Sequence, residues 1–343
     1  MNQKIFDVLF PLAILIAPLY LGAVCLWSYS LSIFVLTASF CLYWFRLQKS
    51  SNAVVIHTRV DALLALYLLF FILSAAQTQI PYKTAIEVFK TLSIFCVFAA
   101  TLYYCRERQK IQSLATAITL FGGAISFFGL LQWLGGIPKP WWRNPHFLSS
   151  VYVNHNHFTG LLEIILPISI GLILAEEGRS KKILFAFLSG LMGMAFILSL
   201  SRGGFLSMML ALVFMLLVLT VRKAVLKAFW IFMVLALIVG TAGALFGFEP
   251  LLQRLETMKN TGSTVDLSMD TRTSIWKGTM DLISKNFWFG TGPGTFESAF
   301  LMFRPPGFTE RPGFAYNDYL QLLADCGIFA FLAAMALFVT LFY

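Results

Sequence analysis

Four arginines stand in or beside the polar breaks of this strongly apolar sequence: Arg202, Arg272, Arg304 and Arg311. A guanidinium group holds its N–H donors in a rigid fork that binds phosphate oxygens two at a time. Arg202 lies in the short break from Leu198 to Gly204 between two long apolar runs, where a charge is costly unless it is paired or serves a ligand. The pattern predicts an anion site, and several converging arginines would suit a membrane-anchored diphosphate. An arginine that reaches lipid phosphates is the alternative for Arg202, and an ordinary solvated charge is favoured for Arg304.

A second polar group surrounds the start of the apolar run that begins near residue 157. Three of the four histidines lie in or beside one loop: His146, His155 and His157. Asn154 and Asn156 alternate with two of them, and Glu163 follows inside the apolar run, where a carboxylate needs a partner. Either Glu163 hydrogen-bonds to a neighbouring helix or to the histidines, or a water-accessible pocket lets His155, His157 or Glu163 handle a proton. A zinc site is less favoured, because no third ligand stands at the usual spacing.

Polar residues also crowd the start of the last apolar run. An interfacial tyrosine belt accounts for Tyr316 and Tyr319, but it does not account for Asn317 and Asp318 between them. The acid and amide are therefore further candidates for a site.

The glycine-rich segment 289–296 is interpreted as a tight structural turn. Its backbone N–H groups could instead face an anion, as in other glycine-rich loops. It is not a nucleotide-binding loop, because no Gly-Lys-Ser/Thr follows it. Upstream, Glu87 and Lys90 stand at i, i+3 spacing and are expected to pair with each other.

The elements that position these residues must be membrane-spanning helices. The chain has 343 residues, of which 59% are hydrophobic and 12% are charged, and its mean hydropathy is +0.80. Continuously apolar runs of this length predict helices, whereas membrane strands alternate. The fold class is therefore an all-α integral membrane protein with about ten spans: 5–22, 25–45, 60–77, 84–104, 112–134, 157–175, 183–199, 203–221, 225–247 and 319–341.

The distribution of basic residues predicts the orientation. Thirteen lie ahead of the first span or in alternate connections, against four in the short connections of the other side. The first side is therefore cytoplasmic, with the N-terminus there, and the net charge of +9 reflects topology and needs no nucleic-acid partner. All the polar breaks named above fall on the outer face.

The predicted domains are a nine-span bundle over 1–247, a large outer loop over 248–318 and a tenth span over 319–343. The loop carries seven basic and eight acidic residues, which indicates a folded segment. Inside it we predict a helix near 271–286, with Asp270 as its N-cap. Its apolar side would consist of Ile275, Trp276, Met280, Ile283 and Phe287.

Taken in order, these motifs resemble the bacterial O-antigen ligase and polymerase superfamily. The similarity extends over about 60–343 and is carried by Asn154-His155-Asn156-His157-Phe158, Ser201-Arg202-Gly203-Gly204, Arg272 to Trp276, Gly290 to Phe296, and Asn317 to Gln321 followed by Gly327. The resemblance implies a transferase in the bacterial inner membrane, acting on the periplasmic face. It would move a glycan from a polyprenyl diphosphate to a hydroxyl of a lipid-anchored sugar, a polysaccharide or a protein, with no cofactor and no metal.

By the same resemblance, Arg202 and Arg272 hold the diphosphate. Further candidates for substrate contact are Arg311, Asn154, Asn156, Asn317 and Glu163. The family pattern has histidine before the Asn-Asp-Tyr-Leu string, where this chain has Tyr316, and tyrosine is a poor general base at neutral pH. The acceptor-activating role therefore passes to His155, His157, Tyr316 itself or Asp318 as candidates. The family also continues with further spans, so a chain ending at Tyr343 is expected to be truncated or minimal.

Two other classes of function stay open. A protein that binds or moves a lipid-linked glycan without cleaving it is one, and the missing histidine motivates it. A polar-lined pore is the less favoured, because charges inside the spans are few.

Overall fold

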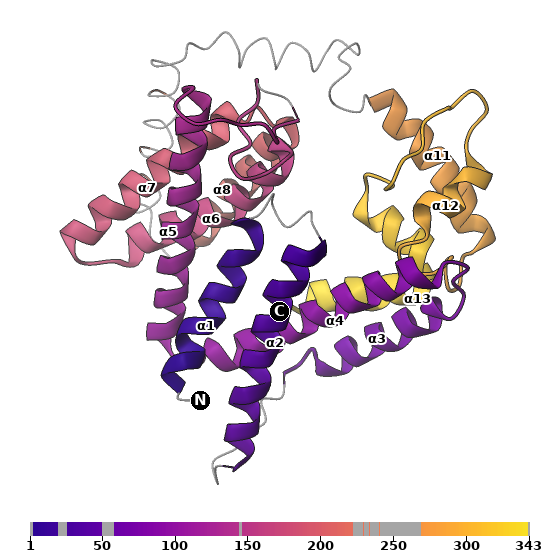
Figure 1. The fold of residues 1–343 in the computed structure, drawn as a ribbon, viewed down its shortest axis with the longest axis horizontal. Coiled ribbons are helices and arrows are strands. Elements are labelled where there is room, and N and C mark those ends of the chain that lie inside the picture. Colours follow the sequence, from indigo (N-terminus) through magenta and orange to yellow (C-terminus); the bar gives the residue numbers. More distant parts are fainter. Residues whose placement is uncertain are drawn as a thin grey trace. The chain divides into compact units, whose positions relative to one another are not determined.

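The computed structural model describes residues 3–19, 26–49, 58–143, 146–221 and 269–341, together with the single positions 229, 233 and 240. Within these ranges every regular element is a helix. The chain divides into two compact units, one of Met1–Ala53 with Ala99–Met258 and one of Val54–Phe98 with Lys259–Tyr343. Figure 1 labels the helices of both units.

The helices of the first unit are α1 (Gln3–Ile16), the short 3-10 helix η1 (Ala17–Leu19), α2 (Leu26–Lys49), α5 (Arg108–Trp133), α6 (His155–Ala175), α7 (Arg179–Leu198) and α8 (Arg202–Val221). Those of the second are α3 (Asp61–Ala75), α11 (Met269–Lys285), α12 (Phe296–Phe300), the 3-10 helix η3 (Leu301–Phe303) and α13 (Asp318–Leu341). Helix α4 (Pro81–Tyr104) runs in the second unit as far as Phe98 and ends in the first.

Within the described part of the chain, six helices are long and apolar enough to cross a membrane: α4, α5, α6, α7, α8 and α13. They coincide with six of the predicted spans. The first three predicted spans contain shorter apolar helices, Phe6–Ile16, Tyr29–Phe45 and Asp61–Ala75, and most of the ninth, 225–247, lies outside the described residues. The prediction of an all-α fold is confirmed for the described residues, and their long apolar helices support a membrane protein. The number of ten spans stays a prediction.

The core of the first unit lies among α5, α6, α7 and α8. Glycines on α5 let the helices approach closely, as small residues do between membrane helices. A Cβ on Gly122 would lie 2.7 Å from Met192 Sδ, and one on Gly123 would lie 2.4 Å from Leu188 Cδ2. The core positions Phe158 and Leu162 on α6 are fully buried.

The second unit is built around an interruption in α13. Gly327 has φ 74° and ψ −178°, so the helix breaks there and resumes at Ile328. A side chain on Gly327 would lie 2.3 Å from the carbonyl oxygen of Trp288, which explains glycine at this position. The amide that the break frees, Ile328 N–H, donates to Phe287 O at 2.9 Å. Helix breaks inside a membrane are tolerated where neighbouring groups satisfy the freed backbone in this way.

The helix predicted near 271–286 is present as α11, Met269–Lys285, although its details differ from the prediction. The helix already includes Met269, so Asp270 lies inside it and is not its N-cap. Its buried side consists of Ile275, Leu282 and Ile283, whereas Met280 is 56% exposed. The reason is Gly278, whose missing side chain lets this face pack against the backbone carbonyl of Phe303.

The rest of the predicted outer loop is also structured where it is described. Helices α11, α12 and η3 share a hydrophobic core with the start of α13, and that core includes Phe296, Phe300 and Ala324. Residues 248–268 of the predicted loop lie outside the described residues.

Candidate functional site

Arg202 is the first residue of α8. The preceding turn is tight: Leu200 adopts a left-handed φ of 51°, and Gly204 N–H donates to Ser201 Oγ at 3.3 Å. No acidic residue lies in the first turn of α8. A cation at a helix N-terminus opposes the helix dipole by about 0.3–1 kcal/mol, whereas an anion there is stabilised. The position of Arg202 therefore favours an anion next to the start of α8.

Gly204 of the same motif is the point at which α8 contacts α6. A Cβ there would lie 2.3 Å from Thr159 Cγ2 and 3.0 Å from Glu163 Oε1. This close approach lets Ser207 Oγ donate to Glu163 Oε2 at 2.6 Å. Of the two interpretations of Glu163, a hydrogen bond to a neighbouring helix is the one present in the structure.

The two glycines of this motif are expected to respond differently to alanine. Gly204→Ala should lower the thermal midpoint of the purified protein by several degrees, because a new methyl group would overlap Thr159, and overpacking costs about 1–3 kcal/mol. Gly203→Ala is the matched control, since no atom lies within 4 Å of its Cβ position and alanine favours helix. Thermal unfolding in detergent checks the pair. Equal midpoints would show that the contact between α6 and α8 is not tight.

The loop between α5 and α6 packs against the end of α7. Leu148 N–H donates to Leu198 O at 3.1 Å, and the indole N–H groups of Trp141 and Trp142 each donate to Ser150 O at 2.8 Å. Ser150 itself has a left-handed φ of 52°. The loop and the Ser-Arg-Gly-Gly break therefore lie at one end of the first unit, as the sequence predicts.

The two histidines that start α6 have different surroundings. His155 is 5% exposed and its ring lies 4.6 Å from that of Phe147, whereas His157 is exposed. Asn156 is exposed as well, and Asn154 Oδ1 accepts its backbone N–H at 2.9 Å, as a helix N-cap does. His157 and Asn156 are thus the members of this group that can reach a ligand directly.

Tyr152 is the titratable group of this loop whose pKa changes most clearly. The side chain is 7% exposed, and its burial raises the pKa to about 12, because the charged phenolate would lose its hydration. Tyr152 is therefore neutral at physiological pH and acts as a core residue here.

In the second unit, Arg272 lies in the first turn of α11. Its Nε atom is buried and has no hydrogen-bond partner within the described part of the chain. A buried donor without a partner is costly. One turn later, Trp276 Nε1 donates to Ala315 O at 3.0 Å, which ties α11 to the segment before α13.

Position 316, where the family has histidine, lies at the entrance of α13. Tyr316 is 42% exposed and has a left-handed φ of 51°. Asn317 Oδ1 accepts the backbone N–H groups of Tyr319 at 3.1 Å and Leu320 at 3.2 Å, so Asn317 caps α13. Asp318 is exposed in the first turn. Among these, Tyr316 and Asp318 are accessible to an acceptor.

The other arginines of this unit are exposed. Arg304 donates to Thr309 O at 3.3 Å, in agreement with a solvated charge. The positive charge of Arg311 lies close enough to Glu297 to lower the pKa of its carboxyl group. The pKa of Glu297 is lowered mainly by its hydrogen bond from Lys83, at 2.6 Å, and less by Arg311. Lys83 and Glu297 thus join α4 to the start of α12.

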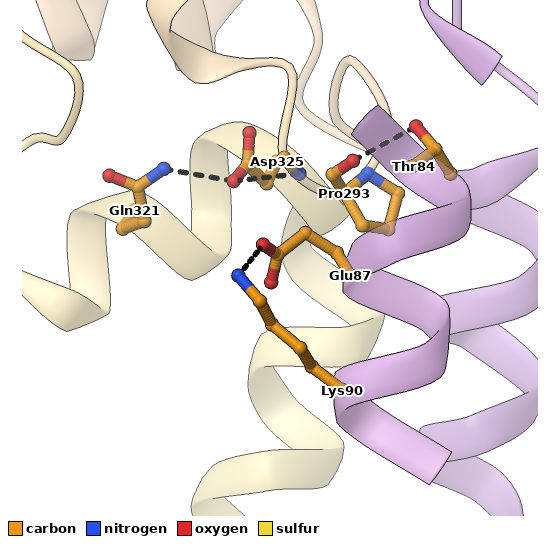
Figure 2. Close-up of polar contacts among 7 residues, drawn as sticks. Thr84, Glu87, Lys90, Pro293, Gln321 and Asp325 are labelled. Atoms are coloured by element: carbon orange, nitrogen blue, oxygen red, sulfur yellow. Dashed lines mark hydrogen bonds and ion pairs between the residues drawn. The ribbon is translucent and has the colours of Figure 1, made fainter. Parts of the chain in front are cut away.

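The glycine-rich segment is a structural turn, as the favoured interpretation states. Its amides are used inside the protein: Thr291 N–H donates to Ala324 O at 3.0 Å and Gly292 N–H to Asp325 O at 2.9 Å. Both carbonyls belong to the turn of α13 before its break. Gly294 N–H faces the Asp325 carboxylate at 3.3 Å (Figure 2). These N–H groups therefore bond to the last turn of α13 before its break, and they are not free to bind an anion.

Figure 2 also shows the predicted pair on α4 and two residues that the sequence-based candidates omit. Lys90 Nζ donates to Glu87 Oε1 at 2.6 Å, which confirms their pairing. Beside them, Gln321 Nε2 donates to Asp325 Oδ2 at 2.8 Å. Asp325 is 8% exposed, and a carboxylate within an apolar run is the signal that could have identified it.

Comparison with known proteins supports the resemblance in the C-terminal part of the chain. The family model described as O-antigen ligase matches residues 187–335. The chain is therefore similar to this family over that segment. The matched segment contains Arg202, Arg272, Arg311 and the residues around Tyr316, while the Asn154-His155-Asn156-His157 motif precedes it. No curated protein matches the chain.

A match to the O-antigen ligase family in a chain with several apolar helices indicates a membrane protein with a function in glycan transfer, and the family implies a lipid-linked glycan and an acceptor as partners in general.

Proposed function

We propose that the protein transfers a saccharide from a polyprenyl-diphosphate carrier to an acceptor hydroxyl on the periplasmic face of a bacterial inner membrane. The acceptor is a lipid-anchored sugar, a growing polysaccharide or a protein. The observation that carries the proposal is the O-antigen ligase match, which includes both arginines predicted to bind the diphosphate.

In this proposal Arg202 and Arg272 bind the diphosphate leaving group. Each lies in the first turn of a helix, where backbone N–H groups and the helix dipole also favour an anion. As the sugar–phosphate bond breaks, negative charge grows on the departing diphosphate. Preorganised guanidinium groups stabilise that charge more strongly than the ground state, which lowers the barrier. Arg311, Asn156 and Glu163 are proposed to contact the donor or its glycan, as are the capping residues Asn154 and Asn317.

The acceptor hydroxyl has to lose a proton in the same step. His157, Asp318 and Tyr316 are the exposed candidates for this role, and His155 is a buried one. An imidazole is the best suited of these side chains to accept a proton near neutral pH.

The direct test is a transfer assay with the purified protein in detergent or liposomes. The donor is an oligosaccharide on polyprenyl diphosphate, and the readout is the glycan joined to acceptor together with released polyprenyl diphosphate. Product formation that requires the protein supports the proposal. Donor binding without product under all acceptor conditions contradicts it.

A second function, binding or movement of the lipid-linked glycan without transfer, is favoured by one observation: tyrosine occupies the family's histidine position. Histidine is better tolerated than tyrosine at a left-handed φ such as the 51° of Tyr316. Tyr316→His is therefore structurally compatible and is expected to raise the transfer rate by about 10²-fold, the lower end of the range for a positioned general base.

The same transfer assay with Tyr316→Phe as the matched control checks this prediction. A gain with histidine and none with phenylalanine eliminates the binding-only function. If Tyr316→His binds donor and still forms no product, the binding function is the better account.

A further inference from the structure

Ala315 lies directly before the position at which the family has histidine. Both of its backbone polar groups are hydrogen-bonded to side chains. It is fully buried, and it belongs to no helix. Irregular backbone buried in a protein must still have its N–H and C=O groups satisfied. Here Ala315 N–H donates to Gln321 Oε1 at 2.7 Å, and Ala315 O accepts from Trp276 Nε1 at 3.0 Å.

Gln321 is itself fixed at its other end. Its Nε2 donates to Asp325 Oδ2 at 2.8 Å, and the same oxygen accepts Gly294 N–H at 3.3 Å (Figure 2). Gln321 and Asp325 lie one helical turn apart on α13, just before the break at Gly327. The amide of Gln321 therefore has both of its polar ends engaged and one preferred orientation.

These contacts form one continuous chain of hydrogen bonds. It runs from the glycine-rich turn through Asp325 and Gln321 to the backbone of Ala315, and then through Trp276 to α11. Two candidate site residues lie next to this chain of hydrogen bonds. Tyr316 directly follows Ala315 in sequence, and Arg272 lies one turn before Trp276 on α11. All of these residues belong to the second unit.

We infer that Gln321 and Asp325 are positioning residues, which set the backbone at position 316 and its placement relative to Arg272 through Ala315 and Trp276. The inference rests on the proposed function, because it links the acceptor-side position to a diphosphate-binding arginine. Neither residue contacts substrate in this account. Their effect is geometric: a small displacement of a group that handles a proton or a leaving group costs rate without removing the group.

The test compares Gln321→Met and Gln321→Glu with wild type. Methionine has a similar length and removes both hydrogen bonds. Glutamate keeps an acceptor for Ala315 N–H and loses the donor to Asp325. We expect kcat to fall about tenfold in Gln321→Met, the equivalent of roughly one hydrogen bond, and at least as far in Gln321→Glu, because the new carboxylate would face that of Asp325, with KM for the donor changing little in both.

Trp276→Phe keeps the ring and removes the N–H donor to Ala315 O. Because both variants act on one backbone residue, the double variant with Gln321→Met should lose much less than the product of the two single losses. Losses that simply multiply would overturn the inference, since they would mean that the two side chains act independently.

Hydrogen–deuterium exchange provides a readout that does not depend on activity. In Gln321→Met, exchange in the peptide spanning 313–317 should become at least about tenfold faster, because the Ala315 amide loses its acceptor. Gln132→Met is the matched control: this glutamine is fully buried in the first unit and donates to Pro138 O at 3.1 Å. It should leave exchange at 313–317 unchanged.

These experiments distinguish failure of the proposed glycan transfer from failure of the positioning role of Gln321 and Asp325. If wild type shows no transfer while exchange at 313–317 responds to Gln321→Met, the proposed function fails and the structural coupling stands. If wild type is active and neither exchange nor kcat responds, the inference fails and the proposed function stands.

Discussion

Replacing Arg272 with lysine is expected to lower kcat/KM for glycan transfer by about 10²-fold, the scale of losing one preorganised donor to a developing oxyanion. Lysine keeps the positive charge and loses the fork that binds two phosphate oxygens at once. The same substitution at Arg202 should have a similar effect, since that residue also lies at a helix start. The transfer assay with a polyprenyl-diphosphate donor measures both variants.

Arg304→Lys is the matched control, because Arg304 is exposed on the same unit as Arg272 and donates to Thr309 O. It should retain wild-type activity. Thermal midpoints of the three variants must be close to wild type for the comparison to concern binding. Full activity of Arg272→Lys would contradict bidentate recognition of the diphosphate.

The largest effect on stability is expected from Gly290→Ala, in the turn that closes the break of α13. Gly290 has φ 69°, and a Cβ there would lie 2.4 Å from the backbone C and O atoms of Asp325. Backbone atoms cannot move aside as a flexible side chain can, so the turn must separate from α13. Left-handed strain of about 1–2 kcal/mol and overpacking of about 1–3 kcal/mol then add. We expect a loss of several kcal/mol in unfolding free energy, or failure to purify as a folded protein.

Gly307→Ala separates the two contributions. Gly307 has a similar φ of 79°, and no atom lies within 4 Å of its Cβ position. It should lose only the conformational part, about 1–2 kcal/mol. Denaturant or thermal unfolding of the two variants measures the difference. Equal losses would mean that the contact between the turn and α13 contributes nothing to stability.

Much of the architecture follows from local sequence. Continuous apolar runs of about twenty residues can satisfy their backbone in lipid only as helices, and for this reason α4 to α8 and α13 were predictable. The pairing of Glu87 with Lys90 was predictable too, because i, i+3 spacing places both on one helical face. The order of the motifs likewise indicated the O-antigen ligase family, which the match to 187–335 supports.

The role of each glycine could not be derived in this way. Gly203 and Gly204 are identical neighbours in sequence, yet only Gly204 contacts α6. The glycine-rich segment fitted an anion site as well as a turn, and the choice depended on Ala324 and Asp325, more than thirty residues away. Packing partners of this kind depend on the tertiary structure, because residue type alone does not state what lies opposite.

Local sequence was thus enough to predict a helical protein with apolar spans, the resemblance to the O-antigen ligase family, and the residue types available for phosphate and proton chemistry. Those properties depend on the hydrophobicity and charge of residues that are close together in the sequence, and on the spacing between them. The links from the glycine-rich turn through Asp325 and Gln321 to Ala315, and from Ala315 through Trp276 to α11, became visible only in the folded chain. Hydrogen bonds between residues distant in sequence require the folded backbone, because no local pattern encodes which donor meets which acceptor.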